Sequence, residues 1–177
     1  MQKVSSKTIS KIKIKKSELA KKLNVSFKIE GKRISLSGNE ENKYIAEKII
    51  KAVESGFELE IAIMLKEPDY VFEEIPIKKF SRRKKPELVK SRIIGTKGRT
   101  LKLLQELSNC NIVLKENIVS IIGRAEEIRL AENAVKRIIQ GSKQANVYSY
   151  LENSRKRFFP EDLGLKENFK KSRTKKL

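Results

Sequence analysis

Apolar residues recur at three- and four-residue steps in two long segments of the chain, and this spacing is typical of amphipathic helices. The later segment carries a continuous stripe formed by Ile128, Ala131, Ala134, Val135, Ile138 and Ile139. The earlier one carries Ile45, Ala46, Ile49, Ile50 and Val53. One apolar stripe per helix suits packing against one face of a sheet, and Gly56 and Gly141 stand where helix C-caps belong.

These two helices belong to an internal repeat. Residues 34–56 read ISLSGNEENKYIAEKIIKAVESG and residues 119–141 read VSIIGRAEEIRLAENAVKRIIQG. The identical pairs include Gly38 with Gly123 and Ala46 with Ala131. Each copy predicts a strand, a glycine turn and a helix, so the chain contains two related units.

Upstream of the second copy, the pattern predicts further elements. Residues 70–77 (YVFEEIPI) form a β-rich run, and 86–94 a short helix with proline in its first turn. After a turn with two glycines, 99–107 predict a helix, and 110–115 and 118–123 predict two strands joined at Glu116-Asn117. A final helix is predicted over 147–158. The second unit therefore has the order β-α-turn-α-β-β-α.

The first unit departs from this pattern. Lys11–Ile14 is interpreted as its first strand, because apolar and charged residues alternate there. Only one short helix, Ser17–Leu23, then fits before the strands 25–29 and 33–36 and the helix 40–55. The glycine turn of the second unit has no counterpart here.

The turn between the two short helices of the second unit reads Arg92-Ile93-Ile94-Gly95-Thr96-Lys97-Gly98-Arg99-Thr100-Leu101. Glycine has no Cβ, so the backbone turns tightly and another backbone can approach it. A turn that opens a helix presents free N–H groups at the positive end of the helix dipole, which suits a phosphate. Lys97 and Arg99 add two cations at the same place.

This spacing resembles the GXXG loop of KH domains, and the element order resembles the type I KH fold over residues 70–141. The resemblance implies an α+β protein of tandem type I KH-like units (β-α-α-β-β-α), with a C-terminal helix and a basic tail. The first unit resembles a degenerate KH unit without the loop. In KH domains the loop clamps the backbone of a short single-stranded segment.

The expected organisation has four parts. Residues 1–56 form the degenerate unit, 57–69 an acidic helical connector, 70–158 the intact KH domain with its following helix, and 159–177 a basic disordered tail. The first unit keeps no loop function. Packing against its twin or a partner is the favoured role for it, and RNA binding through lysines the alternative.

The net charge of the chain indicates which class of partner it binds. The chain has 41 Lys and Arg against 22 Asp and Glu, a formal net charge of +19. Such a field attracts polyanions, with nucleic acid first and a membrane surface second. No apolar run is long enough to span a membrane and no signal peptide is evident, so a cytoplasmic protein is expected.

Enzymatic chemistry is disfavoured. The chain has no histidine and one cysteine, Cys110, which excludes an internal disulfide, a Cys/His zinc site and a His-dependent nucleophile. The loop lacks P-loop spacing and no acidic cluster for Mg²⁺ lies near it. No catalytic residue, metal or cofactor is therefore expected, and Cys110 is interpreted as a small core residue.

Single-stranded RNA is the expected ligand, lying between the two short helices and the strand 110–115. The candidate contacts share this location: Lys84, Lys85, Arg92, Ile94, Gly95, Thr96, Lys97, Gly98, Arg99, Leu101 and Ile112. Gly95–Gly98 would hold the RNA backbone and Lys97 and Arg99 neutralise phosphates. Ile94, Leu101 and Ile112 are expected to form an apolar floor under the bases, with plain core positions as the alternative. The basic stretch 78–92 extends the phosphate-binding surface.

A closer resemblance covers roughly Lys7 to Arg157. A loop-less first unit, an acidic connector, IIGTKGRT in the second unit and the ending GSKQANVYSYLENSRKR together resemble the Pno/Dim/Krr family of small-subunit ribosome assembly factors, in its short archaeal form. The resemblance implies binding of small-subunit ribosomal RNA near its 3′ end and work with the endonuclease that trims it. A general single-stranded RNA- or DNA-binding KH protein, such as an RNA-decay complex subunit, and a protein-interaction scaffold remain the alternatives.

Overall fold

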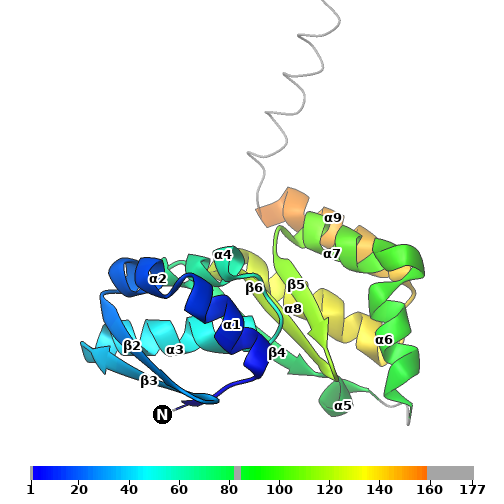
Figure 1. Ribbon diagram of the computed structural model, residues 1–177. Helices are drawn as coiled ribbons and strands as arrows, with labels where there is room; N and C mark the ends of the chain where they lie inside the picture. Colours follow the sequence, from blue (N-terminus) through cyan, green and yellow to red (C-terminus); the bar gives the residue numbers. More distant parts are fainter. Residues whose placement is uncertain (1, 82–84, 159–177) are drawn as a thin grey trace, which may run out of the picture.

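The computed structural model describes residues 2–81 and 85–158, which form two α+β units side by side (Figure 1). Each unit has a three-stranded antiparallel sheet covered by helices. The sheet orders are β1-β3-β2 in the first unit and β4-β6-β5 in the second. The last strand of each sheet in sequence therefore lies in the middle, so the two units share one topology.

The first unit follows the order β-α-α-β-β-α. Its elements are β1 (Gln2–Lys3), α1 (Ser6–Ile14), α2 (Lys16–Leu23), β2 (Val25–Glu30), β3 (Arg33–Gly38) and α3 (Glu40–Glu54). The predicted strand over Lys11–Ile14 was wrong, because these residues end α1. Alternation in a strand would put Ile12 and Ile14 on one face, yet Ile12 is 1% exposed and Ile14 82% exposed.

Helical spacing explains this outcome. Ile9 and Ile12 lie three residues apart and both are buried, and the Ser5 side chain caps the helix by accepting a hydrogen bond from the Thr8 N–H. The expectation of only one short helix in this unit was therefore also wrong. The first strand lies further upstream, where β1 pairs with β3.

The junction between α1 and α2 is a single residue, Lys15, in place of a glycine loop. Two ion pairs tie this corner to the connector: Lys11 Nζ lies 2.9 Å from Glu58, and Lys15 pairs with Glu60. The hydrogen bond and charge of Glu60 raise the pKa of Lys15. Lys15 therefore stands where the second unit has its glycine turn, and its ammonium is paired with a carboxylate of the connector.

The connector consists of α4 (Leu59–Ala62) and a 3-10 helix, η1 (Ile63–Lys66). Its apolar side chains, Phe57, Leu59, Ala62 and Leu65, are buried in the core of the first unit. The connector is thus part of that unit's packing.

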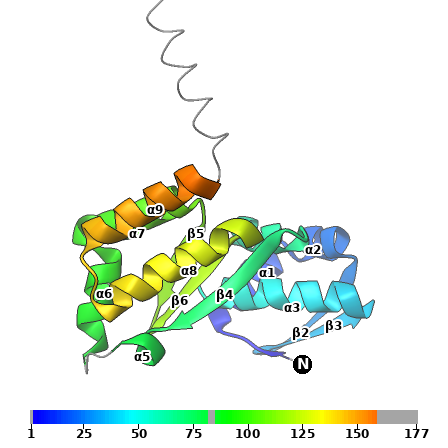
Figure 2. The same ribbon diagram turned by 180° about the vertical axis from the view of Figure 1, so that it is seen from behind.

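The second unit contains the candidate loop. Its elements are β4 (Tyr70–Pro76), α5 (Ile77–Phe80), α6 (Pro86–Ile94), η2 (Thr96–Gly98), α7 (Arg99–Ser108), β5 (Asn111–Lys115), β6 (Ile118–Arg124), α8 (Ala125–Gln140) and α9 (Gln144–Phe158). Figure 2 shows α8 lying across the sheet, with α9 beside α7. The short helix α5 was not predicted, and α9 begins earlier than the expected Val147.

The second sheet is buried on both faces, and alternation along its strands divides the side chains. Ile75, Val119 and Ile121 point into the core shared with the helices of their own unit. Phe72, Val113 and Ile122 belong to the core of the first unit instead. The rings of Phe57 and Phe72 meet edge to face, with centroids 6.3 Å apart. The first unit therefore covers the sheet face that the helices leave open.

Polar contacts frame this junction. Glu74 on β4 forms an ion pair of 2.6 Å with Lys51 and accepts a hydrogen bond of 3.0 Å from the Ser55 hydroxyl. Gly56 follows at a φ of +109°, and a Cβ there would lie 3.1 Å from Val113 Cγ1. The two units are therefore in close contact through side chains and backbone alike. Among the described residues, no helix is both long and apolar enough to cross a bilayer.

Candidate nucleic-acid interface

The loop Gly95–Gly98 links α6 to α7 by an abrupt reversal of the backbone. Gly95 ends α6 at φ 72° and ψ 176°, a region open essentially to glycine alone. The Gly95 N–H donates to the Ser91 carbonyl over 2.8 Å, and Gly98 N–H returns to the Gly95 carbonyl over 3.2 Å. Gly98 is at φ 76°, so both glycines hold conformations that other residues avoid.

Between the glycines, Lys97 also takes a left-handed conformation, at φ 54° and ψ 32°. A non-glycine residue there stores strain of about 1 kcal/mol or more, and such strain concentrates at ligand-binding positions. Thr96 and Lys97 are both exposed. The tip of the loop is therefore accessible to a large ligand.

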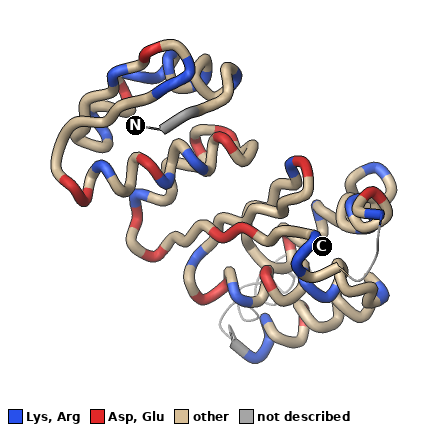
Figure 3. The backbone as a smooth tube through the Cα atoms, turned by 90° about the horizontal axis from the view of Figure 1, so that it is seen from below, with Lys and Arg blue, Asp and Glu red and all other residues tan. Residues whose placement is uncertain are grey.

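The two cations at this tip, Lys97 and Arg99, are exposed. Within the described ranges, neither Lys97 nor Arg99 takes part in an ion pair, whereas Lys102 one turn further on lies 3.8 Å from Glu106. Arg99 begins α7, whose dipole places partial positive charge at the same end. Figure 3 shows Lys and Arg distributed over both units with acids among them. The loop is thus an electropositive point in a mixed surface.

The three predicted floor residues do not share one environment. Ile94 is 40% exposed and Leu101 is half-buried, but Ile112 is only 2% exposed and belongs to the core of the second unit. Ile112 therefore cannot offer its side chain to a base, and for this residue the core alternative applies. Its N–H, which faces away from β6 on the edge strand β5, donates to Gln105 Oε1 over 3.0 Å.

Other predicted contacts separate into two groups. Lys85 is exposed immediately before α6 and remains a candidate, while Lys84 lies outside the described residues. Arg92 is half-buried, and its guanidinium donates to the Ser142 carbonyl over 2.6 Å. Arg92 thus supports the site from inside the protein.

Sequence analysis missed three side chains: Thr100 and Gln144 beside the loop, and Gln105, which accepts from the Ile112 N–H on β5. Thr100 is 4% exposed, and its hydroxyl accepts a hydrogen bond of 2.9 Å from Gln144 Nε2. A polar residue on the buried side of α7 is a usable sequence signal for Thr100. Gln144 has none, because its contacts are far away in the sequence and arise only from packing of α9.

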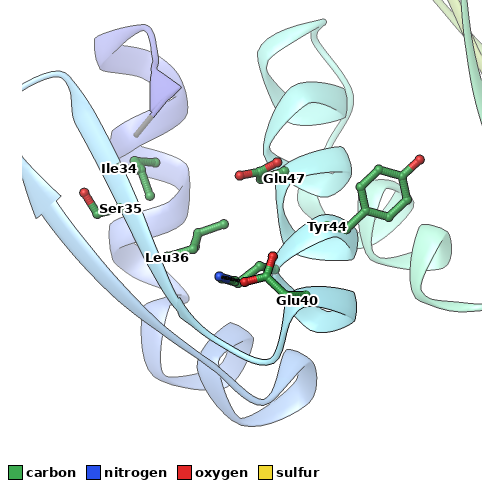
Figure 4. Close-up of a pocket in the computed structure, with 7 residues that line it drawn as sticks. Ile34, Ser35, Leu36, Glu40, Tyr44 and Glu47 are labelled. Carbon is green, nitrogen blue, oxygen red and sulfur yellow. Dashed lines mark hydrogen bonds and ion pairs between the residues drawn. The ribbon is translucent and has the colours of Figure 1, made fainter.

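Two hollows lie away from the loop. One of about 330 Å³ lies in the first unit, between Ile34, Ser35 and Leu36 of β3 and Glu40, Lys43, Tyr44 and Glu47 of α3 (Figure 4). Another of about 260 Å³ lies between the units and is lined by Lys51, Glu54, Glu74 and Lys115. Across the part of the chain that the structure describes, no group of three or more His, Cys, Asp or Glu is arranged to hold a metal ion.

Cys110 is a core residue, as interpreted from the sequence. It is 4% exposed, and burial raises the pKa of its thiol to about 12. The thiol donates to the Ser108 carbonyl over 3.4 Å. Burial therefore disfavours the thiolate, which is the nucleophilic form of cysteine.

The loop geometry, the strand order and the family comparison agree on the class of the second unit. Residues 71–156 match the family model of the eukaryotic type KH domain, KH-domain type I. The second unit is therefore a type I KH domain with an intact GXXG loop, as the sequence predicted.

Comparison with known proteins extends the similarity to the first unit. Dim2p from Pyrococcus horikoshii superposes with a TM-score of 0.76 at 26% identity, covering 86% of this chain and 96% of that structure. The same comparison with the a/eIF2alpha–aDim2p–rRNA complex from that organism gives 0.79 at 25% identity, covering 89% and 93%. A KH domain-containing protein of Methanocaldococcus jannaschii is 29% identical over 149 residues, which are 80% of this chain and 66% of the relative.

Eukaryotic relatives carry the name Pno1. The RNA-binding protein pno1 of Drosophila melanogaster is 29% identical over 138 residues, 73% of this chain and 58% of the relative. The chain thus spans less than two thirds of the length of these curated relatives. The second unit therefore belongs to the type I KH domains, and the chain as a whole is similar to the Pno1 and Dim2 proteins.

Proposed function

We propose that this chain is a ribosome assembly factor that binds single-stranded ribosomal RNA through the GXXG loop of its second unit. The observation that carries the proposal is the exposed tip at Thr96 and Lys97, held between two glycines, where Lys97 and Arg99 form no ion pair with any described residue. In KH domains this loop clamps about four backbone nucleotides.

The bases would lie against the exposed part of Ile94, the half-buried Leu101 and the free edge of β5. In the RNA-free protein the Ile112 N–H is occupied by Gln105 Oε1. We propose that an acceptor atom of an RNA base replaces Gln105 Oε1 at the Ile112 N–H. The side-chain amide of Gln105 is then free to form a hydrogen bond with the same base. Lys85 and the other exposed cations would follow the phosphates, and Arg92 would hold the loop from behind.

The ribosomal assignment is supported by the relatives. The Schizosaccharomyces pombe protein is named a pre-rRNA-processing protein, and it is 31% identical over 108 residues, 59% of this chain and 45% of that protein. One of the two similar structures from Pyrococcus horikoshii is an a/eIF2alpha-aDim2p-rRNA complex. We therefore propose small-subunit ribosomal RNA near its 3′ end as the target, and RNA binding without catalysis as the activity.

A protein partner fits the first unit. Its loop position is occupied by Lys15, which pairs with Glu60, and it keeps an exposed helix face on α3 that includes Tyr44 and Lys48. A groove for four nucleotides discriminates poorly among cellular RNAs, so further contacts are needed for specificity. We propose that the endonuclease that trims the small-subunit RNA, or a protein such as the a/eIF2alpha found with aDim2p, supplies them.

Crosslinking in cells tests the assignment. The full chain is crosslinked to RNA, and the attached positions are sequenced beside those of a variant with Thr96→Asp and Lys97→Asp expressed at the same level. Enrichment near the 3′ end of small-subunit RNA, lost in the variant, is expected. A diffuse distribution over messenger RNA would reduce the function to that of a general KH binder.

A further inference from the structure

Gln144, the first residue of α9, joins the two helices that flank the GXXG loop. Its Nε2 donates to the Arg92 carbonyl in the last turn of α6 and to Thr100 Oγ1 in the first turn of α7, both over 2.9 Å. A primary amide carries two N–H groups, and both are used here. One side chain therefore bridges the entry and the exit of the loop.

A second contact runs in the opposite direction. The Arg92 guanidinium donates to the Ser142 carbonyl over 2.6 Å, in the segment between α8 and α9. Arg92 thus accepts from Gln144 through its main chain and donates to Ser142 through its side chain. Reciprocal hydrogen bonds of this kind fix both the distance and the rotation of one segment relative to the other.

The segment that carries Gln144 is itself well anchored. Gly141 ends α8 at φ 108°, and the Ser142 N–H donates to the Arg137 carbonyl over 2.9 Å. Further along α9, Val147 and Leu151 are each 1% exposed in the core of the second unit. Gln144 therefore acts from a fixed base.

The bridge ends where the loop is most crowded. A Cβ at Gly95 would lie 2.1 Å from Thr100 Oγ1, the same oxygen that accepts from Gln144. A shift of Thr100 is thus transmitted directly to Gly95 and to the strained Lys97 that follows. If α6 and α7 moved apart, Gly95 and Lys97 would be free to leave their positive-φ conformations.

We propose that Gln144 is a positioning residue, which holds the GXXG loop in its binding conformation before RNA arrives. The inference rests on the RNA-binding function proposed above. Gln144 spends both amide hydrogens inside the protein, so it makes no phosphate contact of its own. Its effect is preorganisation, since a loop that is already ordered loses less entropy on binding.

The test compares Gln144→Met with Gln140→Met, a matched change at an exposed glutamine at the end of α8. Methionine keeps the length of the side chain and removes its donors. In the RNA-free Gln144→Met protein, the backbone amide resonances of Gly95, Lys97 and Gly98 shift and their hydrogen exchange accelerates. RNA affinity falls about five- to tenfold, the scale of one or two neutral hydrogen bonds. The Gln140→Met protein behaves as wild type in all three measurements.

Salt dependence separates positioning from direct contact. A lost phosphate contact reduces the slope of log affinity against log salt by about 0.7 on a single strand. Gln144→Met is expected to leave the slope unchanged, whereas Lys97→Gln reduces it. A reduced slope in Gln144→Met would overturn the inference, because Gln144 would then touch the RNA.

A double-mutant cycle completes the test. Thr100→Val removes one acceptor of the bridge without changing the shape of the residue, and its effect on RNA affinity is expected to shrink in the Gln144→Met background. The inference is refuted if the effects of Thr100→Val and Gln144→Met on RNA affinity are fully additive. It is also refuted if Gln144→Met leaves both the loop resonances and the RNA affinity unchanged. If the wild-type chain binds no RNA, the proposed function fails, but the loop resonances and exchange rates still decide the inference.

Discussion

Thr100 fills the space that a side chain at Gly95 would need. A Cβ on Gly95 would lie 2.1 Å from Thr100 Oγ1, 2.6 Å from its Cβ and 2.9 Å from its backbone nitrogen. The last of these atoms cannot move without displacing α7. The close approach of helix end to helix start therefore depends on glycine at position 95, in addition to its left-handed φ of 72°.

Gly95→Ala is expected to destabilise the protein by about 3 kcal/mol, from overpacking and backbone strain together. Gly98→Ala is the matched control: its φ is +76°, but a Cβ there has nothing within 4 Å. It is expected to lose only about 1 kcal/mol, the strain alone. Thermal unfolding should therefore show a drop of about 6–12 °C for the first and about 2–4 °C for the second. Equal drops would mean that the contact with Thr100 has no energetic weight.

Replacing Thr96 and Lys97 by aspartates should abolish specific RNA binding while the fold remains. Both side chains are exposed, and aspartate tolerates the left-handed conformation of Lys97 better than most residues. Two carboxylates would then face the phosphate at the start of α7. The corresponding double asparagine variant removes the cation without adding negative charge. Its loss of RNA affinity, measured by fluorescence titration, should therefore be smaller. Similar affinities for wild type and the aspartate variant would refute the clamp.

RNA affinity should fall steeply with salt. Six to eight phosphate contacts would give a log–log slope of roughly −4 to −6 on single strands, at about −0.7 for each contact. Neutralising Lys84 and Lys85 should flatten the slope by about one unit or slightly more. Lys66→Gln, on the connector, serves as the control and should leave it unchanged. A nearly salt-independent affinity would place the RNA elsewhere on the protein.

Cys110 should resist alkylation in the native protein. Burial raises the pKa of its thiol from 9.0 to about 12, so the reactive thiolate is scarce at pH 8. Iodoacetamide is expected to label the unfolded chain rapidly and the native chain at the rate of unfolding. Because the folded pKa is the higher one, the thiol's contribution to stability is complete below about pH 9 and is lost as pH rises toward 12. Rapid labelling of the native protein at pH 8 would contradict this enclosed environment.

The second unit was predictable because its signals agree with one another. Pro86 at the start of α6, the two glycines and the apolar stripe ending at Ile139 all favour the same order of elements. In the first unit, the alternating residues of Lys11–Ile14 fit a strand as well as the end of a helix. The burial of Ile12 and exposure of Ile14 decide between them, and burial depends on tertiary packing.

The candidate site was only partly predictable for the same reason. Residues of the loop itself are adjacent in the sequence, so the motif reveals them. Ile112 was expected in an apolar floor under the bases, with a core position as the alternative, and its side chain is 2% exposed in the core of the second unit. Gln144 reaches Arg92 and Thr100 only because α9 folds back beside α7, a contact that no local pattern encodes.

The placement of Ile122 has a consequence for how the chain folds as it is synthesised. Ile122 lies in β6, yet it packs in the core of the first unit together with Phe72 and Val113. These residues emerge from the translating ribosome after every strand and helix of the first unit. We therefore expect the nascent first unit to complete its core only after β6 has been made, so that the usual folding of an N-terminal unit ahead of the next one is delayed here.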